Sequence, residues 1–183
     1  MKITLLGDSI RLQYESKVKE LLGTDFEVWG PADNCRFAKY TLRGMFDWAA
    51  QMEGAEIVHW NNGHWDICNL FGDGSFSSEE EYIANMLRIV ALLQKKHKVI
   101  IFSTTTPVRS TNPHSNNQII AHYNELIVPK LREKGVIIND LYGLVATDID
   151  KYIRKDDNIH LTEDGAKVCA KQVARMIREA AEG

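Results

Sequence analysis

The chain has 183 residues, of which 44% are hydrophobic and 26% are charged, and its formal net charge at pH 7 is −3. These proportions are those of an ordinary globular protein, and they exclude a disordered, collagen-like or coiled-coil chain. The length fits one domain spanning residues 1–183. No basic excess is available to bind a phosphate backbone, which argues against a dedicated nucleic-acid-binding protein.

No apolar run approaches the roughly 18 residues that a membrane-spanning helix needs. The apolar stretch Ile3–Leu6 is too short for a signal peptide, and the charged Arg11 follows it closely. The cysteines are an odd, scattered set (Cys35, Cys68 and Cys169), which implies no disulfide framework. We therefore expect a cytoplasmic protein with no membrane span.

Short apolar runs alternate with longer segments of helical periodicity along the first half of the chain. The expected strands are Ile3–Leu6, Phe26–Trp29 and Ile57–Trp60. The expected helices are Ile10 to about Leu22 and Thr41 to about Met52. The loop that follows the third strand, up to residue 76, has no periodicity and is expected to be irregular.

The second half continues the same alternation. Ser78 and Glu81 form a capping-box pattern, which predicts a helix that runs through Gln94. The later expected strands are Val99–Phe102 and Val136–Ile138. The later expected helices are Gln118–Lys134, Leu141–Ile153 and a last helix capped by Thr162.

The expected strands lack a polar alternation, which is typical of strands that are buried on both faces of a parallel sheet. Strands that alternate with helices predict a three-layer α/β/α fold, namely a flavodoxin-like, doubly wound sheet of five parallel strands. In this architecture ligands bind outside the carboxyl ends of the strands. The residues that follow each strand should therefore carry the chemistry.

Polar and reactive side chains do collect at the expected strand ends. The segments concerned are Gly7-Asp8-Ser9 after the first strand, Asn34-Cys35-Arg36 after the second, Asn61-Asn62-Gly63 after the third, and Asp157-Asn158-Ile159-His160 ahead of the last helix. A gathering of such residues at one edge of a sheet is typical of an enzyme active site.

Ser9 lies between a glycine-containing turn and a helix, near free backbone N–H groups and the positive end of the helix dipole. It is a candidate nucleophile, although serine is also a preferred helix cap. A serine nucleophile needs a base, and His160 is a candidate because Asp157, three residues earlier, can accept a hydrogen bond from its Nδ1. The alternative for His160 is a solvated loop histidine beside a capping aspartate.

Gly7-Asp8-Ser9 after the first strand and Asp157-x-x-His160 before the last helix resemble the SGNH/GDSL hydrolase superfamily, over residues 3 to about 175. The resemblance implies ester hydrolysis through an acyl-enzyme, with Ser9 as nucleophile, His160 as base and Asp157 as orienting acid. It implies no metal and no organic cofactor. The expected partner is a small-molecule ester, with a short acyl group such as acetyl on a polar alcohol such as a carbohydrate.

The resemblance also implies an oxyanion hole built from the Ser9 N–H, a glycine N–H after the second strand and an asparagine amide after the third. This chain departs from the pattern after its second strand, where Cys35 or Arg36 takes the glycine position. A backbone N–H near Cys35 survives that change, provided that the conformation suits a residue with a side chain.

The chain departs again after the third strand. The family pattern Gly-x-Asn-Asp corresponds to Gly63-His64-Trp65-Asp66, which puts Trp65 where the asparagine belongs. Asn61 or Asn62 can supply the amide instead, and Asn61 is favoured because it lies nearest to the strand end. Removing one oxyanion donor typically lowers turnover about 10²–10³-fold, so the choice matters.

Two weaker signals have structural alternatives. Trp60 and Trp65 flank the expected site, and one of them could stack on the apolar face of a sugar, although tryptophans are more often core or loop anchors. His64, Asp66 and Cys68 alternate on one loop, but they lack a fourth ligand at a recognisable spacing, so a metal site is disfavoured.

Other functions remain open on the sequence. A lysophospholipase or thioesterase would use the same residues on a different ester. A catalytically silent carbohydrate-binding or partner-binding domain would keep the fold alone. A nucleotide-binding flavodoxin-like domain is disfavoured, because the first strand-end turn lacks a glycine cluster that could hold phosphates.

Overall fold

The computed structural model describes the whole chain, Met1–Gly183. Its centre is a five-stranded sheet with the order β2-β1-β3-β4-β5, in which every neighbouring pair is parallel. The strands are β1 (Lys2–Leu6), β2 (Glu27–Trp29), β3 (Ile57–Trp60), β4 (Val99–Ser103) and β5 (Ile137–Asn139). This is the flavodoxin-like strand order, and it confirms the fold that the sequence predicts.

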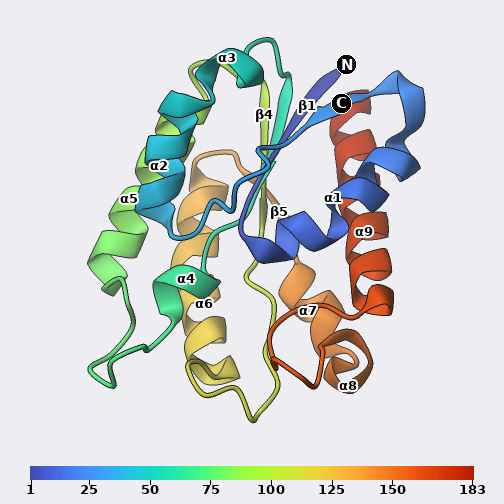
Figure 1. Cartoon of the computed structure of the whole chain (residues 1–183). Coiled ribbons are helices and arrows are strands. Elements are labelled where there is room, and N and C mark those ends of the chain that lie inside the picture. The colour runs from blue at the N-terminus through green and yellow to red at the C-terminus, as the bar shows by residue number, and fades with distance from the viewer.

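Helices cover both faces of the sheet (Figure 1). One layer contains α1 (Ser9–Leu22), α7 (Leu141–Ala146), α8 (Ile149–Tyr152) and α9 (Glu163–Glu182), and the other contains α2 (Ala38–Asp47), α3 (Ala49–Met52), α5 (Glu79–Leu93) and α6 (Asn117–Glu133). The short helix α4 (His64–Ile67) follows β3, and a 3₁₀ turn (Gly23–Asp25) follows α1. None of these helices combines the length and the apolar character needed to cross a membrane.

The buried side chains of the strands divide between two apolar clusters, one on each face of the sheet. In β3, for example, Ile57 packs in the cluster under α1 and α9, whereas Val58 and Trp60 pack in the cluster under α2, α5 and α6. Successive side chains of a strand point to opposite faces, so a strand covered on both sides carries mostly apolar residues on both of its faces. This burial explains why the strands show no polar alternation.

Helix caps account for most of the observed boundaries. Ser78 and Glu81 form the expected capping box at the start of α5, and Thr162 accepts a hydrogen bond from the Gly165 N–H at the start of α9. The expected helix Leu141–Ile153 is wrong as a single element, because Asp148 caps a separate helix, α8, through the Lys151 N–H.

Two further differences concern the layer that contains α2. The expected helix from Thr41 to Met52 starts earlier, at Ala38, and is divided at Trp48, whose side chain folds back over Gly44. The helix α4 lies in a loop that was expected to be irregular. One turn of helix is too short to show a periodicity in the sequence.

The fold brings the segments that follow β1 and β3 together with the segment ahead of α9 at one edge of the sheet. The order of the strands reverses between β1 and β3, which lie side by side, and this reversal opens a crevice at their carboxyl ends. The start of α1, helix α4 and the segment that leads into α9 meet at this edge (Figure 1).

Candidate active site

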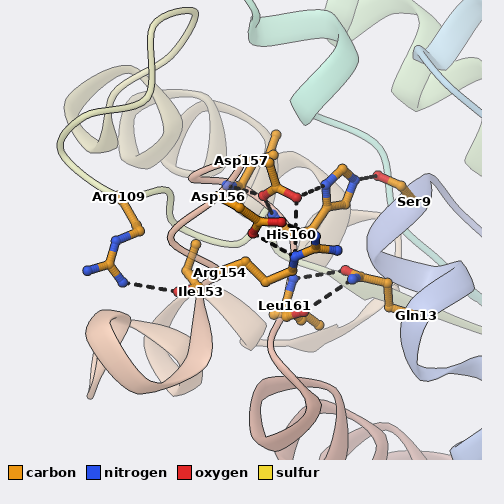
Figure 2. A network of polar contacts seen from close by, with 10 residues as sticks. Ser9, Gln13, Arg109, Ile153, Arg154, Asp156, Asp157, His160 and Leu161 are labelled. Carbon is orange, nitrogen blue, oxygen red and sulfur yellow. Dashed lines mark hydrogen bonds and ion pairs between the residues drawn. The ribbon is translucent and has the colours of Figure 1, made fainter.

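Ser9 is the first residue of α1, and its hydroxyl is not used as a helix cap. Asp8 is the N-cap, and its Oδ1 accepts a hydrogen bond from the Ile10 N–H at 3.0 Å. The Ser9 Oγ instead lies 2.8 Å from the Nε2 of His160 (Figure 2). The N–H of Ser9 belongs to the first turn of the helix, where N–H groups have no partner within the helix. The capping alternative for Ser9 is therefore wrong.

His160 and Asp157 form a compact turn between α8 and α9. The Nδ1 of His160 lies 3.1 Å from one carboxylate oxygen of Asp157, and the other oxygen accepts the N–H groups of Ile159 and His160 at 3.1 and 2.9 Å. Asn158, within the turn, has a φ of 64°, a left-handed conformation that asparagine tolerates better than most residues. The hydrogen bonds thus run without a gap from Asp157 through His160 to Ser9 (Figure 2).

The Asp157 carboxylate is held in its ionised form. Partial burial raises its pKa, but the N–H groups of His160 and Ile159 and the imidazole together outweigh burial, so the pKa lies below its usual range. An ionised Asp157 accepts the Nδ1 proton of the imidazole and fixes the tautomer in which Nε2 is free to accept a proton. The side chains of His160 and Asp157 are 32% and 30% exposed, so the site is open to solvent.

Cys35 does not supply the expected oxyanion donor. Its N–H donates to the Gly7 carbonyl at 3.0 Å, and its Sγ accepts the Gly7 N–H at 3.2 Å. Cys35 is fully buried, and burial raises the pKa of its thiol to about 11. The residue that adopts a left-handed, glycine-like conformation is Arg36, with a φ of 50°, and its N–H donates to the Asn34 side chain at 2.8 Å. Both N–H groups are therefore already engaged.

The two candidate asparagines occupy different environments. The Nδ2 of Asn62 donates to the Arg36 carbonyl, and its Oδ1 accepts hydrogen bonds from Thr41 and Trp60. Asn61 instead packs against Gly7, where a Cβ would lie 2.0 Å from its Oδ1. The side-chain amide of Asn61 is bonded to no protein group, and its buried Oδ1 has no partner. Of the two asparagines, only Asn62 has its side-chain amide engaged within the protein.

Only one of the two flanking tryptophans reaches the surface. Trp60 is fully buried in β3 and packs against Phe102 at a centroid distance of 4.7 Å, so the expected stacking role is wrong for this residue. Its side chain belongs to the apolar cluster beneath α2, α5 and α6, and its Nε1–H donates to the Asn62 Oδ1 at 2.9 Å. Trp65, on α4, is 40% exposed.

The alternating residues of α4 diverge to separate partners. The Nε2 of His64 lies 2.9 Å from the Thr106 hydroxyl, Asp66 accepts hydrogen bonds from Ala38 and Ser77, and the Cys68 thiol donates to a backbone carbonyl. No group of three or more His, Cys, Asp or Glu side chains is arranged to hold a metal ion. Burial lowers the pKa of His64, which keeps its ring neutral at pH 7.

Arg11 is a site residue that the sequence did not reveal. Its side chain is fully buried and pairs with Glu15, one turn along α1. The guanidinium also donates to the carbonyls of Gly7, Pro31 and Asp33, at 3.4, 2.9 and 2.8 Å. Arg11 thereby joins the turn after β1 to the loop after β2. The only sequence signal for it was an Arg-to-Glu spacing of four residues directly after Gly7-Asp8-Ser9.

Known proteins are similar to this chain in sequence and in fold. A GDSL esterase/lipase of Arabidopsis thaliana is 25% identical over 175 residues, which cover 79% of this chain and 68% of the plant protein. No protein-family model matches the sequence.

Two solved structures superpose over nearly the whole chain. An acetyl xylan esterase superposes with a TM-score of 0.81 at 20% identity, covering 97% of this chain and 100% of its own. A lipase/acylhydrolase of Enterococcus faecalis superposes with a TM-score of 0.80 at 17% identity, covering 98% and 96%. The fold of these proteins agrees with the resemblance seen in the two end motifs.

Proposed function

We propose that this chain, which belongs to the SGNH/GDSL hydrolase superfamily and is a GDSL-type ester hydrolase, removes a short acyl group, acetyl foremost, from a polar alcohol such as a carbohydrate. Ser9 is the nucleophile, His160 the general base and Asp157 the orienting acid. The observation that carries the proposal is the unbroken series of hydrogen bonds from the Asp157 carboxylate through the imidazole to the Ser9 hydroxyl.

Acylation follows from this geometry. The Nε2 of His160 takes the Ser9 proton as Oγ attacks the ester carbonyl, and the oxyanion forms beside the first turn of α1. The Ser9 N–H and the Asn61 amide hold this oxyanion. The imidazolium, stabilised by Asp157, then protonates the leaving alcohol as the carbonyl re-forms and the C–O bond breaks. The serine now carries the acyl group.

Deacylation repeats these steps with water as the nucleophile. The neutral imidazole takes a proton from water, which attacks the acyl carbonyl, and the same donors hold the second oxyanion. The imidazolium returns the proton to Ser9 Oγ as the acid leaves. No other protein group has to gain or lose a proton in the cycle.

The openness of the site supports a small acyl group. The imidazole and the carboxylate are each about one-third exposed, so they are not enclosed in an apolar chamber. A groove of about 660 Å³ does exist, but it is lined by α2, α3, the end of α5 and the segments that lead into β3 and β4. It therefore lies at the amino end of the sheet, opposite Ser9, where it cannot receive an acyl chain attached to Ser9.

A sugar as the alcohol has two supports. Trp65 is exposed on α4, directly beyond the segment that carries Asn61, and an exposed indole packs well on the apolar face of a sugar ring. A solved protein of the same fold is an acetyl xylan esterase.

The test compares p-nitrophenyl acetate with the octanoate and then screens acetylated sugars, with Ser9→Ala as the control. We expect a higher kcat/KM for acetyl, and acetate release from at least one sugar that Ser9→Ala does not produce. A preference for octanoyl would favour a lysophospholipase or thioesterase instead. A Ser9 that resists fluorophosphonate labelling would mean a silent binding domain.

A further inference from the structure

One face of α1 contacts the segment that carries His160 at three successive turns. Residues four apart lie above one another on a helix, so Ser9, Gln13 and Lys17 share this face. Ser9 lies 2.8 Å from His160, Gln13 contacts the backbone of Leu161, and Lys17 pairs with Glu163 at 2.8 Å. The helix that presents the nucleophile therefore also contacts the residue next to the base.

The contact between Gln13 and Leu161 is reciprocal. The Nε2 of Gln13 donates to the Leu161 carbonyl at 3.2 Å, and the Oε1 accepts the Leu161 N–H at 2.9 Å (Figure 2). Leu161 is only 3% exposed. Buried peptide groups need partners, and here a single side-chain amide supplies both of them.

The other side of this segment explains why Gln13 is needed. Ile153 and Leu161 form an antiparallel bridge, in which Arg154 N–H donates to the His160 carbonyl and Thr162 N–H to the Tyr152 carbonyl, both at 2.8 Å. In such a pair the polar groups of the bridging residue point away from its partner. The N–H and carbonyl of Leu161 thus face α1, where the Gln13 amide takes the place of a third strand.

The turn Asp157–His160 holds its own shape through internal hydrogen bonds, but these bonds do not set its position relative to α1. Asp157 binds the N–H groups of the turn and the imidazole, so these parts move as one body. Other anchors come from outside α1. The Arg109 N–H donates to the Asn158 carbonyl at 3.0 Å from the β4–α6 loop, and Arg154, just after α8, donates its N–H to the His160 carbonyl at 2.8 Å and pairs with Asp157 at 3.4 Å. Next to His160, the anchor that comes from the helix of Ser9 itself is Gln13.

We propose that Gln13 is a positioning residue that sets the separation between the Ser9 hydroxyl and the His160 imidazole. The proposal rests on the function proposed above. Gln13 touches neither the imidazole nor the nucleophile, so it acts through the backbone of Leu161. A misplacement of about 1 Å between reacting groups lowers a rate by up to about 10²-fold, so this anchor sets the rate of acylation.

The test replaces Gln13 with Met, which keeps the length of the side chain and removes both hydrogen bonds. We expect kcat for an acetyl ester to fall about 10- to 100-fold with KM little changed. Fluorophosphonate labelling of Ser9 should slow by a similar factor. Gln13→Glu keeps an acceptor for the Leu161 N–H but sets a second carboxylate oxygen against the Leu161 carbonyl, so its kcat should also fall below that of the wild type.

The matched control is Lys17→Met, which breaks the neighbouring contact on the same face of α1. We expect this variant to keep the kcat and the labelling rate of the wild type. Equal losses in Gln13→Met and Lys17→Met, or a loss that only follows the folded fraction, would show a general packing role and overturn the proposal.

NMR of the imidazole nitrogens tests the proposal without any substrate. In Gln13→Met the Nε2 resonance should shift as the bond to Ser9 is lost, while the Nδ1 resonance, set by Asp157, should stay in place. An Nε2 resonance that is the same in the wild type, Gln13→Met and Lys17→Met overturns the proposal. If the Nε2 resonance shifts only in Gln13→Met but the wild type hydrolyses no ester, the positioning role stands and the proposed function fails.

Discussion

The two halves of the site differ in how completely they are assembled in the free chain. The half proposed to transfer the proton, here called the proton-transfer half, consists of Ser9, His160 and Asp157. These residues are joined by hydrogen bonds of 2.8 and 3.1 Å. In the half proposed to hold the oxyanion, here called the oxyanion half, the N–H groups of Cys35 and Arg36 are already engaged within the protein, and so is the amide of Asn62.

The difference follows from how each half is connected along the chain. Asp157 and His160 belong to one short turn that makes its own hydrogen bonds, so only the distance from this turn to α1 has to be set by the fold. The donors of the oxyanion half come from separate strand ends and meet only through tertiary packing. Substitutions should therefore affect turnover most strongly in the proton-transfer half, and more moderately in the oxyanion half.

Ser9→Ala should have the largest effect. Without the hydroxyl no acyl-enzyme forms, and we expect kcat/KM to fall by about four to six orders of magnitude. The hydroxyl caps no helix, so the thermal unfolding midpoint should remain within a few degrees of the wild type. The measurement is hydrolysis of p-nitrophenyl acetate together with thermal unfolding. Activity retained in purified Ser9→Ala would place the nucleophile elsewhere.

Asp157→Asn should come next, with a loss of about 10²–10⁴-fold in kcat. The amide keeps the size of the side chain but presents a donor or a neutral acceptor to the His160 Nδ1, which destabilises the imidazolium. The pKa of Asp157 lies below its usual range, so the wild type should keep this interaction down to mildly acidic pH. Steady-state kinetics from pH 5 to 8 provide the check. A variant with wild-type kcat would show that Asp157 serves only the turn.

Asn61→Ala should lower kcat about 10²–10³-fold, because one oxyanion donor is lost. The matched control is Asn62→Ala, which removes hydrogen bonds to Arg36, Thr41 and Trp60. We expect Asn62→Ala to lower the unfolding midpoint more than it lowers the kcat of the folded protein. The opposite pattern in the two variants would exchange the roles of these asparagines.

The sequence predicted the fold and the contact of Ser9 with His160 and Asp157 from the order of strands and helices. Apolar strands bounded by turns define the sheet, and parallel strands place all their carboxyl ends at one edge, where Ser9 begins the helix that follows β1. The Asp157–His160 pair is local in sequence, and its geometry follows from the residue spacing.

The oxyanion half and the anchors could not be predicted in this way. Asn61 and Asn62 are adjacent, and successive residues point to opposite sides, so choosing between them requires the orientation of the strand end. The same uncertainty made Trp60 look like a surface residue. Gln13 gave no signal because its partner is the peptide group of a residue 148 positions away. Every residue has a peptide group, so the sequence does not indicate which one a glutamine side chain will bind.

Asp66 contacts the start of α2, and its substitution should give the smallest effect, on stability rather than on turnover. Burial raises the pKa of the Asp66 carboxyl to about 7, against hydrogen bonds from Ser77 and Ala38 that lower it. An unfolded aspartate titrates near about 3.9. The folded chain therefore binds this proton more tightly, so the stabilisation is complete below about pH 4 and is lost as the pH rises through about 7.

Asp66→Asn, a neutral replacement of similar shape, removes this titration. The unfolding midpoint of the variant minus that of the wild type should rise by a few degrees between pH 5 and 8, as the wild type is forced to bury a charge. Asp73→Asn, at an exposed loop position, should give a flat difference over the same range. A flat difference for Asp66→Asn as well would mean that the Ala38 N–H and the Ser77 hydroxyl keep this carboxylate ionised, so that the start of α2 contacts a full negative charge throughout this pH range.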